Sequence, residues 1–248
     1  MRRGADEAAL AREQAFFDAH YADPEIRNAQ LKYYEALGVC RARYFALVRE
    51  AAAGGRLLDY CCGVGETAFE LAGVPAETFG IDISAEAVAQ ANARAEAHGL
   101  NARFVQGDAH ATGFADASFD VVASTGVIHH LEVERAWREV HRLLKPGGTA
   151  VFVEALGHNP AIALYRRLTP NARSPDEHPL LRRDFRVAEQ LFSSVRYDFH
   201  GLAAIAAVFA PEGLRAGAMQ AMRGLDKALL SVPGLRWNAW AVLVVLKK

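Results

Sequence analysis

The stretch 57-LLDYCCGVGETAFELA-72 is the part of the sequence that decides the fold. An apolar run contains an acidic residue, Asp59, and is followed by small residues at alternate positions, Cys61, Gly63 and Gly65. Small side chains let the backbone pass close beneath a ligand, and glycine adopts dihedral angles that other residues avoid. The helix that follows would direct backbone N–H groups and a partial positive charge toward that ligand. The pattern therefore predicts a strand, a ligand-binding turn and a helix.

This turn differs from the dinucleotide-binding fingerprint G-x-G-x-x-G, because the third glycine is missing and Asp59 precedes the glycines. A carboxylate there suits a ligand that bears an ammonium group and would repel a pyrophosphate, which argues against a nicotinamide-dependent reductase. The adjacent Cys61 and Cys62 lack the C-x-x-C spacing of a redox pair, and they have too few thiols or histidines nearby for a metal site. We interpret Cys61 as a small residue of the turn and Cys62 as a residue packed inward.

Strands and helices alternate along the rest of the chain. Such alternation predicts an α/β fold, in which helices cover both faces of a mostly parallel sheet. Right-handed crossovers then place the carboxyl ends of the parallel strands along one edge, where open sheets bind ligands. The expected strands are residues 56–61, 78–82, 102–106, 119–124, 149–155, 195–200 and 239–246, and the expected helices are 5–20, 25–52, 66–72, 85–98, 132–144, 160–168, 184–193 and 201–230.

Acidic residues end the second and third strands of this series. Asp82 follows the turn by about 20 residues, at the place where a carboxylate can accept both hydroxyls of a ribose. Asp108 comes directly after the third strand, from where it can accept a hydrogen bond from an adenine amino group. With Asp59, these residues indicate a site for an adenosine-like ligand that also carries an amine. The alternative roles are structural: a helix or turn cap for Asp59 and an N-cap of the helix 85–98 for Asp82.

The ordered motifs LLDYCCGVG, GIDIS, GDA, FDVVASTGVIHHL and LLKPGGTAVFVE resemble those of the class I S-adenosylmethionine-dependent methyltransferases over residues 56–155. The resemblance implies a Rossmann-like seven-stranded sheet with a reversed last strand, and S-adenosylmethionine as the cofactor. The sequence departs from the D/E-x-G-x-G-x-G pattern of this family at Cys61, which is small enough for the first glycine position.

The resemblance also implies roles for particular residues. Asp59 would orient the methionine end of the cofactor, Asp82 would hold the ribose, and Asp108 with the backbone of Ala109 would recognise the adenine. The two glycines of the turn would underlie the ligand. The complete set of implied cofactor residues is Asp59, Cys61, Gly63, Gly65, Asp82, Ile83, Asp108, Ala109, Ser124 and Thr125.

Methyl transfer from a sulfonium depends mainly on the alignment of nucleophile, methyl carbon and sulfur, and it needs a general base only when the acceptor loses a proton. His129 and His130 follow the fourth strand and Glu154 ends the fifth, so they are candidates for a base or a substrate contact. The alternatives are a packed ring, a helix cap or a satisfied buried acid. His178 lies in the polar turn 176-DEH-178, which offers a base or a metal ligand but lacks the spacing of a zinc site. We therefore predict no metal site.

The chain divides into four expected segments. Residues 1–55 would form helices that cap the pocket, 56–155 the cofactor-binding core, 156–193 an inserted lid, and 194–248 the completion of the sheet. Aromatic residues near the N-terminus and polar residues of the insertion are candidates for acceptor contacts, although ordinary packing and a solvated charged surface explain them as well. The candidates for acceptor contacts are Tyr33, Tyr34, Tyr165, Arg166 and Arg173.

The composition limits the possible partners. A net charge of −1 gives no electrostatic basis for binding nucleic acid. Three cysteines favour a reducing, cytoplasmic setting, and we find neither a signal peptide nor an apolar run of about 20 residues that would span a membrane. The sequence thus predicts a methyltransferase (EC 2.1.1.-) for a small-molecule acceptor, with a lipid or an anionic natural product among the candidates. The acceptor atom and the oligomeric state stay open. The alternatives are a non-methylating enzyme that uses S-adenosylmethionine and a cofactor-binding scaffold or regulatory subunit.

Overall fold

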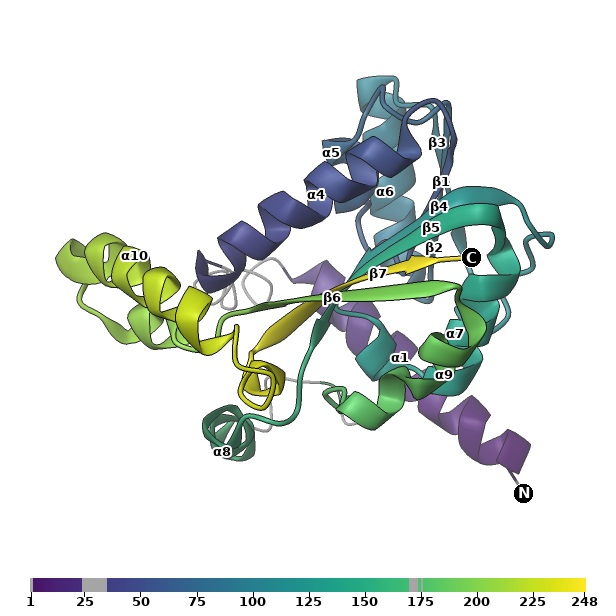
Figure 1. Cartoon of the computed structure of the whole chain (residues 1–248). Coiled ribbons are helices and arrows are strands. Elements are labelled where there is room, and N and C mark those ends of the chain that lie inside the picture. The colour runs from purple at the N-terminus through teal and green to yellow at the C-terminus, as the bar shows by residue number, and fades with distance from the viewer. Residues whose placement is uncertain (1, 24–34, 170–173, 175) are drawn as a thin grey trace.

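The computed structural model describes residues 2–23, 35–169, 174 and 176–248 (Figure 1). These residues form one seven-stranded sheet with the strand order β3-β2-β1-β4-β5-β7-β6. Neighbouring strands are parallel except where β7 is involved, which runs antiparallel to both β5 and β6. The predicted Rossmann-like sheet with a reversed last strand is confirmed. The strands are β1 (Arg56–Tyr60), β2 (Glu77–Asp82), β3 (Ala102–Gln106), β4 (Phe119–Thr125), β5 (Leu144–Ala155), β6 (Ser194–His200) and β7 (Ala241–Lys247).

Helices cover both faces of the sheet, as predicted. α4, α5 and α6 lie on one face, and α7 and α9 lie on the other (Figure 1). On the first face, Tyr44 and Val48 of α4 pack in one buried cluster with Val151. On the second, the ring of Trp137 lies 5.3 Å from that of Phe152. Complete burial of an apolar side chain of this size contributes roughly 1.5–3 kcal/mol to folding. The helices are α1 (Arg2–Ala22), η1 (Glu35–Leu37), α4 (Gly38–Ala52), α5 (Glu66–Glu70), α6 (Ala85–His98), η2 (Ile128–His130), α7 (Val133–Leu143), α8 (Pro160–Leu168), η4 (Arg182–Phe185), α9 (Arg186–Leu191), η5 (Ala204–Phe209), α10 (Glu212–Leu229) and η6 (Arg236–Asn238).

The segment 145-KPGG-148 lies inside β5, whereas the sequence suggested a break between a helix and a strand. α7 ends at Leu143 and β5 begins at the next residue, Leu144. The pairing of β5 with β4 is irregular over this segment, and Gly147 has a positive φ of 78°. A β-bulge absorbs extra residues without ending the strand. The expected boundary at residue 149 was therefore wrong, because turn-forming residues here form a bulge.

Two other expected helices are each divided. The expected helix 184–193 consists of η4 and α9, and the expected helix 201–230 consists of η5 and α10. The second division falls at Pro211, which lacks the backbone N–H needed to continue a helix. Of the expected helix 25–52, the structure describes η1 and α4, and the remainder lies outside the described residues. No helix in the described part of the chain combines the length and the apolar character needed to cross a membrane.

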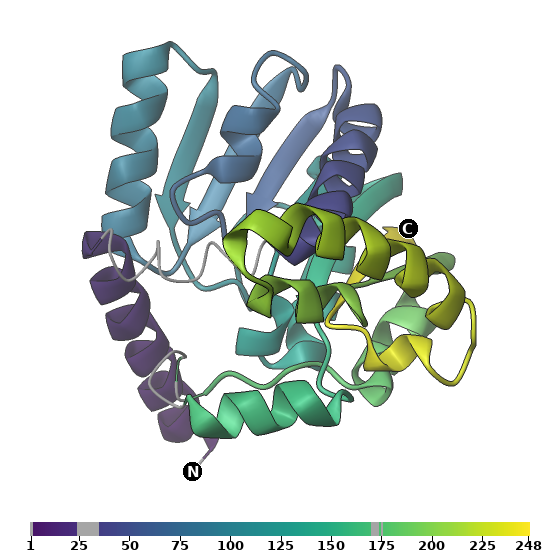
Figure 2. The ribbon, with the colours of Figure 1, turned by 90° about the vertical axis from the view of Figure 1, so that its left-hand side faces the viewer.

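α1 lies across the carboxyl edge of the sheet, on the same side of the molecule as α8 (Figure 2). Near its C-terminal end, Asp18 Oδ1 accepts a hydrogen bond of 2.5 Å from Ser84 Oγ, just before α6. At the middle of α1, the guanidinium of Arg12 donates two hydrogen bonds of 2.8 and 2.9 Å to the carboxylate of Asp176. These contacts hold α1 over the edge at which ligands bind in open α/β sheets.

Candidate active site

A pocket of about 430 Å³ lies between α1 and the carboxyl edge of the sheet. α1 contributes Phe17 and Tyr21 to its wall, and the loop after β4 contributes Gly126 and Val127. None of these four was among the predicted site residues, although the aromatic residues of the N-terminal helix were a signal. Six predicted cofactor residues line this pocket, namely Cys61, Asp82, Ile83, Asp108, Ala109 and Thr125.

The turn after β1 has left-handed backbone conformations at each of its alternate small residues. The φ angles are 53° at Cys61, 50° at Gly63 and 80° at Gly65. A Cβ atom at Gly63 would overlap the hydroxyl group of Tyr21, and one at Gly65 would lie 2.9 Å from the ring of Phe104. Glycine is therefore required at the second and third positions for conformation and for space. At the first position cysteine fits the space, but its left-handed conformation costs roughly 1–2 kcal/mol.

Asp82 holds this turn against the end of β2. Its Oδ2 accepts the backbone N–H of Gly63 at 2.8 Å, and its Oδ1 accepts that of Ser84 at 2.9 Å. The side chain is 6% exposed, and burial raises the pKa of the Asp82 carboxyl. The alternative role as N-cap of α6 belongs to Ser84 instead, whose Oγ accepts the N–H of Ala87 at 3.1 Å. Asp82 thus both shapes the turn and faces the ligand pocket.

Asp59 is directed away from the pocket and toward the start of α5. Its Oδ2 accepts the backbone N–H of Ala68 at 3.2 Å, and the side chain of Thr67 also donates to it. Burial raises the pKa of Asp59 to about 8. This geometry is that of a helix cap, and Asp59 is not part of the pocket lining. Gly63, Gly65 and Ser124 are not part of the lining either, and the Oγ of the buried Ser124 has no hydrogen-bond partner among the described residues.

Asp108 forms a local network with His110, a lining residue that the sequence analysis missed. The backbone N–H of Glu132 donates to His110 Nε2 at 2.9 Å, so the proton of a neutral ring lies on Nδ1. Nδ1 is 2.7 Å from Asp108 Oδ1, which also accepts the backbone N–H of His110 at 2.8 Å. The hydrogen bond from His110 lowers the pKa of Asp108. The carbonyl of Ala109 accepts a hydrogen bond of 2.6 Å from Tyr60, which fixes this loop.

Two carboxylate–histidine pairs lie beyond the end of β4. Glu154 is fully buried; its Oε1 accepts the N–H groups of Val127 and Ile128, and its Oε2 is 2.8 Å from Nδ1 of His129. The second pair joins Nδ1 of His130 to Glu13 Oε2 of α1 at 3.1 Å.

The second pair, and not the first, is exposed to the pocket. His130 and Glu13 both line the pocket, whereas His129 and Glu154 lie behind it. The hydroxyl group of Ser174 donates to the other oxygen of Glu13. Glu13 was missed by the sequence analysis, because its partners lie far along the chain.

The turn 176-DEH-178 is attached to this region through its backbone. The N–H of His178 donates to the carbonyl of His129 at 2.8 Å, while the side chain of His178 is exposed. The neighbouring Glu177 forms an ion pair of 2.6 Å with Arg166 of α8. The structure therefore brings Glu177, and not the predicted His178, to the histidines. Of the other predicted substrate contacts, Tyr33, Tyr34, Arg173 and the side chain of Tyr165 lie outside the described residues.

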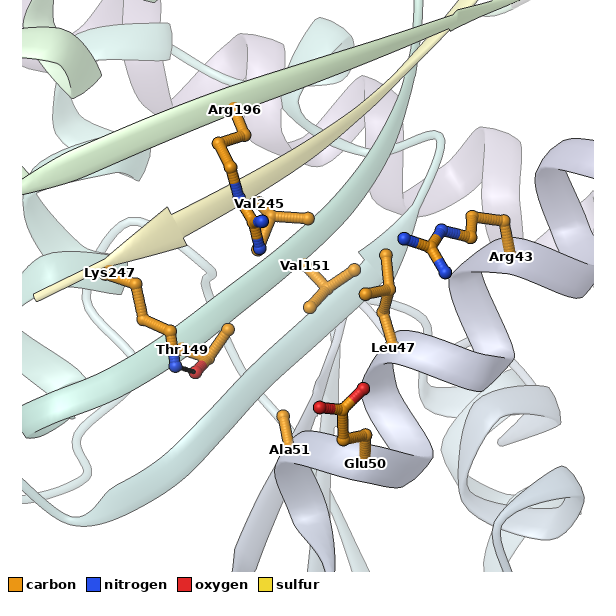
Figure 3. A pocket seen from close by; sticks show the side chains of 9 residues that line it. All are labelled: Arg43, Leu47, Glu50, Ala51, Thr149, Val151, Arg196, Val245 and Lys247. Atoms are coloured by element: carbon orange, nitrogen blue, oxygen red, sulfur yellow. Dashed lines mark hydrogen bonds between the residues drawn. The ribbon is translucent and has the colours of Figure 1, made fainter.

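A second hollow lies between α4 and the strands β5, β6 and β7 (Figure 3). It has a volume of about 470 Å³, and Val151 and Val245 form its apolar floor. Arg43, Arg196 and Lys247 surround this floor (Figure 3). It contains none of the predicted cofactor residues, and we do not assign it to the ligand.

The structure combines a glycine turn held by a strand-end carboxylate, a second carboxylate after β3 and a reversed β7, and its strand order is that of the class I methyltransferase fold. Residues 58–152 match the family described as Methyltransferase domain. This match and the relatives below support the predicted class I S-adenosylmethionine-dependent methyltransferase, and solved structures of the same fold contain the predicted cofactor or its product.

Particular relatives agree with this assignment. The chain is 29% identical over 229 residues to a demethylmenaquinone methyltransferase of Lactococcus lactis, covering 80% of this chain and 89% of that protein. It is 38% identical over 102 residues to a demethylmenaquinone methyltransferase of Thermus thermophilus, covering 40% and 46%. The chain spans about half the length, or less, of several further curated relatives. Phosphoethanolamine N-methyltransferase 2 of Haemonchus contortus, solved with S-adenosylmethionine, superposes with a TM-score of 0.66 at 19% identity, covering 95% of this chain and 59% of that one.

Proposed function

We propose that this chain transfers the methyl group of S-adenosylmethionine to a small-molecule acceptor bound between α1 and the end of β4. The observation that carries the proposal is one continuous pocket, whose lining includes both the strand-end carboxylates Asp82 and Asp108 and the imidazole of His130. A donor bound over the glycine turn and an acceptor beside the histidine would share this pocket. Such positioning is the main contribution that an enzyme makes to this reaction.

The charge of the pocket supports a neutral or cationic acceptor. Its lining contains several carboxylates and one arginine, Arg135. Arg166, which suggested an anionic acceptor in the sequence analysis, is paired with Glu177. Apolar side chains such as Phe17 and Leu131 complete the lining. An acceptor with an apolar body and a neutral or positively charged polar group fits this surface better than an anion does. The carboxylates that surround the pocket are Glu7, Glu13, Asp82, Asp108, Glu132 and Asp176.

His130 is the group that we assign as proton acceptor for an acceptor that reacts through O–H or N–H. The lone pair of that oxygen or nitrogen forms the new bond to the methyl carbon, and the electrons of the broken C–S bond return to sulfur. The proton that is released passes to Nε2 of His130, because Glu13 holds Nδ1. His129 and Glu154 lie behind this ring, with the two imidazole centroids 4.4 Å apart, and we assign them positioning roles.

A screen with methyl-labelled S-adenosylmethionine and fractionated metabolite extracts tests the proposal. We expect label in a small organic product, together with an equal amount of S-adenosylhomocysteine, and no label with the Asp82→Ala variant. Conversion of an acceptor without consumption of the cofactor would replace the proposal with a non-methylating enzyme. Tight cofactor binding with no turnover in any fraction would favour the scaffold or regulatory subunit.

A further inference from the structure

The histidines after β4 meet a third potential metal ligand. One ligand atom each from His129, His130 and Glu177 lies within 4.8 Å of the other two. These residues come from η2 and from the turn after α8, and the hydrogen bond from His178 N–H to the carbonyl of His129 fixes the two segments together. The sequence spacing gave no sign of this cluster, because a ligand far along the chain completes it. We propose that this His129–His130–Glu177 cluster binds a divalent transition metal ion.

The first argument is the way in which both rings are held. Glu154 lies 2.8 Å from Nδ1 of His129, and Glu13 lies 3.1 Å from Nδ1 of His130. A carboxylate on one ring nitrogen fixes the tautomer and increases the basicity of the other nitrogen, which is the usual arrangement around metal-binding histidines. Both rings therefore present Nε2 as the available donor. A single general base needs only one carboxylate–histidine pair, whereas a metal site would use both histidines as ligands and both carboxylates as their partners.

The second argument is charge. The buried Glu154 and Glu13 lie behind the rings, and Glu177 lies beside them with Arg166 as its partner. With neutral histidines, three carboxylates and one guanidinium give the cluster a formal charge of −2. A divalent cation would neutralise this charge, and bound cations are often the dominant local charges in such sites. The ion pair with Arg166 is formed through Oε1 of Glu177.

The third argument is geometry. Zinc is bound by histidine and carboxylate at about 2.0–2.2 Å, so that ligand atoms in a tetrahedral site lie about 3.4 Å apart. Because all three ligand atoms lie within 4.8 Å of one another, no pair would have to close by more than about 1.4 Å to reach this spacing. Two imidazoles and one carboxylate suit zinc, iron, nickel or copper, whereas magnesium prefers oxygen ligands.

The inference rests on the proposed function in one respect, the role of His130. Its Nε2 cannot accept a proton while it binds a metal ion, so the metal-loaded enzyme would lack the proposed proton acceptor. Metal binding would therefore inhibit the transfer of methyl groups to acceptors that must lose a proton.

Cobalt titration of the tag-free, chelator-treated protein tests the site directly, because bound Co²⁺ absorbs visible light according to its ligands. We expect one saturable site per chain, displacement of Co²⁺ by Zn²⁺ and no displacement by Mg²⁺. Glu177→Gln should weaken cobalt binding at least tenfold. Glu134→Gln, a carboxylate change on the exposed face of α7 that leaves the cluster and α1 intact, should alter it less than twofold.

Three results would overturn the site. The first is the absence of saturable cobalt binding. The second is an equal affinity of the parent protein and of Glu177→Gln for cobalt. The third is an intense sulfur-to-cobalt charge-transfer band, which would assign the ion to Cys61 and Cys62. Calorimetry with S-adenosylhomocysteine on the same samples separates this failure from that of the proposed function. A protein that binds the nucleoside but not cobalt loses only the metal site.

Discussion

Oδ2 of Asp82 accepts the backbone N–H of Gly63 at 2.8 Å, and this bond joins the end of β2 to the turn that follows β1. The same carboxylate lines the candidate cofactor pocket. One side chain therefore sets the shape of the turn and borders the pocket.

Replacement of Asp82 by alanine should weaken the binding of S-adenosylhomocysteine at least tenfold, a loss of about 1.4 kcal/mol or more. The buried N–H groups of Gly63 and Ser84 would lose their acceptor, and the ribose would lose a partner. Isothermal calorimetry measures the affinity, and circular dichroism verifies the fold. Unchanged affinity in a folded variant would show that Asp82 acts on the turn alone.

Gly63→Ala should also weaken cofactor binding at least tenfold, because the new Cβ would overlap the hydroxyl of Tyr21 across the pocket. Gly73→Ala is the matched control: its φ of 77° is similarly left-handed, but no atom lies within 4 Å of the added carbon. Both variants should lose about 1 kcal/mol of stability from the backbone conformation. Only the first should lose affinity, and equal losses in both would contradict the predicted contact with Tyr21.

Asp59 should make the ligand-free protein less stable as the pH rises from about 4 toward 8. Burial raises its pKa to about 8, above that of the unfolded chain, so the folded state binds the proton more tightly. The stabilisation from this proton is complete below the unfolded pKa and is lost as the pH rises through the folded pKa.

Asp59→Asn removes this titration and keeps an oxygen for the N–H of Ala68. Urea unfolding at several pH values should therefore show that the variant gains stability relative to the parent protein between pH 5 and pH 8. The comparison between variants cancels the contribution of carboxyls with lowered pKa values, such as Asp108. A pH-independent difference would exclude a raised pKa at Asp59.

His130→Ala should leave the affinity for S-adenosylhomocysteine within about twofold and should lower kcat at least tenfold, within the usual range for loss of a general base. Glu13→Gln should retain more activity than His130→Ala, because the amide can still contact Nδ1 and hold the ring in place. His98→Ala, an exposed histidine on α6, serves as a control. Equal turnover of the parent and His130→Ala on the true acceptor would remove the base from the mechanism.

The order of strands and helices and the carboxylates at strand ends were predictable, because hydrophobic periodicity and the position of acids such as Asp82 and Asp108 are local properties. The direction of a side chain is not a local property. Asp59 ends the same kind of strand, yet its carboxylate points to the N–H of Ala68. The sequence therefore predicted that Asp59 lies near the edge of the sheet, but it did not predict which N–H groups donate hydrogen bonds to its carboxylate.

Contacts between distant segments were also beyond the sequence. His130 was recognisable as a candidate, but its partner Glu13 lies 117 residues away. Glu177 reaches the histidines through a backbone hydrogen bond between two loops. Such pairings depend on how α1 and the segment after α8 pack over the sheet, which no residue pattern within either segment encodes.

The cysteine in the glycine turn has a chemical consequence for the enzyme itself. A sulfonium methyl group is an alkylating agent, and a thiolate is a strong nucleophile for it. Cys61 lines the pocket in which that methyl donor would be held. Burial, reinforced by Asp82 and Glu154, raises the pKa of the Cys61 thiol well above its usual range and keeps the sulfur protonated. Burial, together with the neighbouring carboxylates, would thus protect this cysteine from methylation by a donor bound in the pocket.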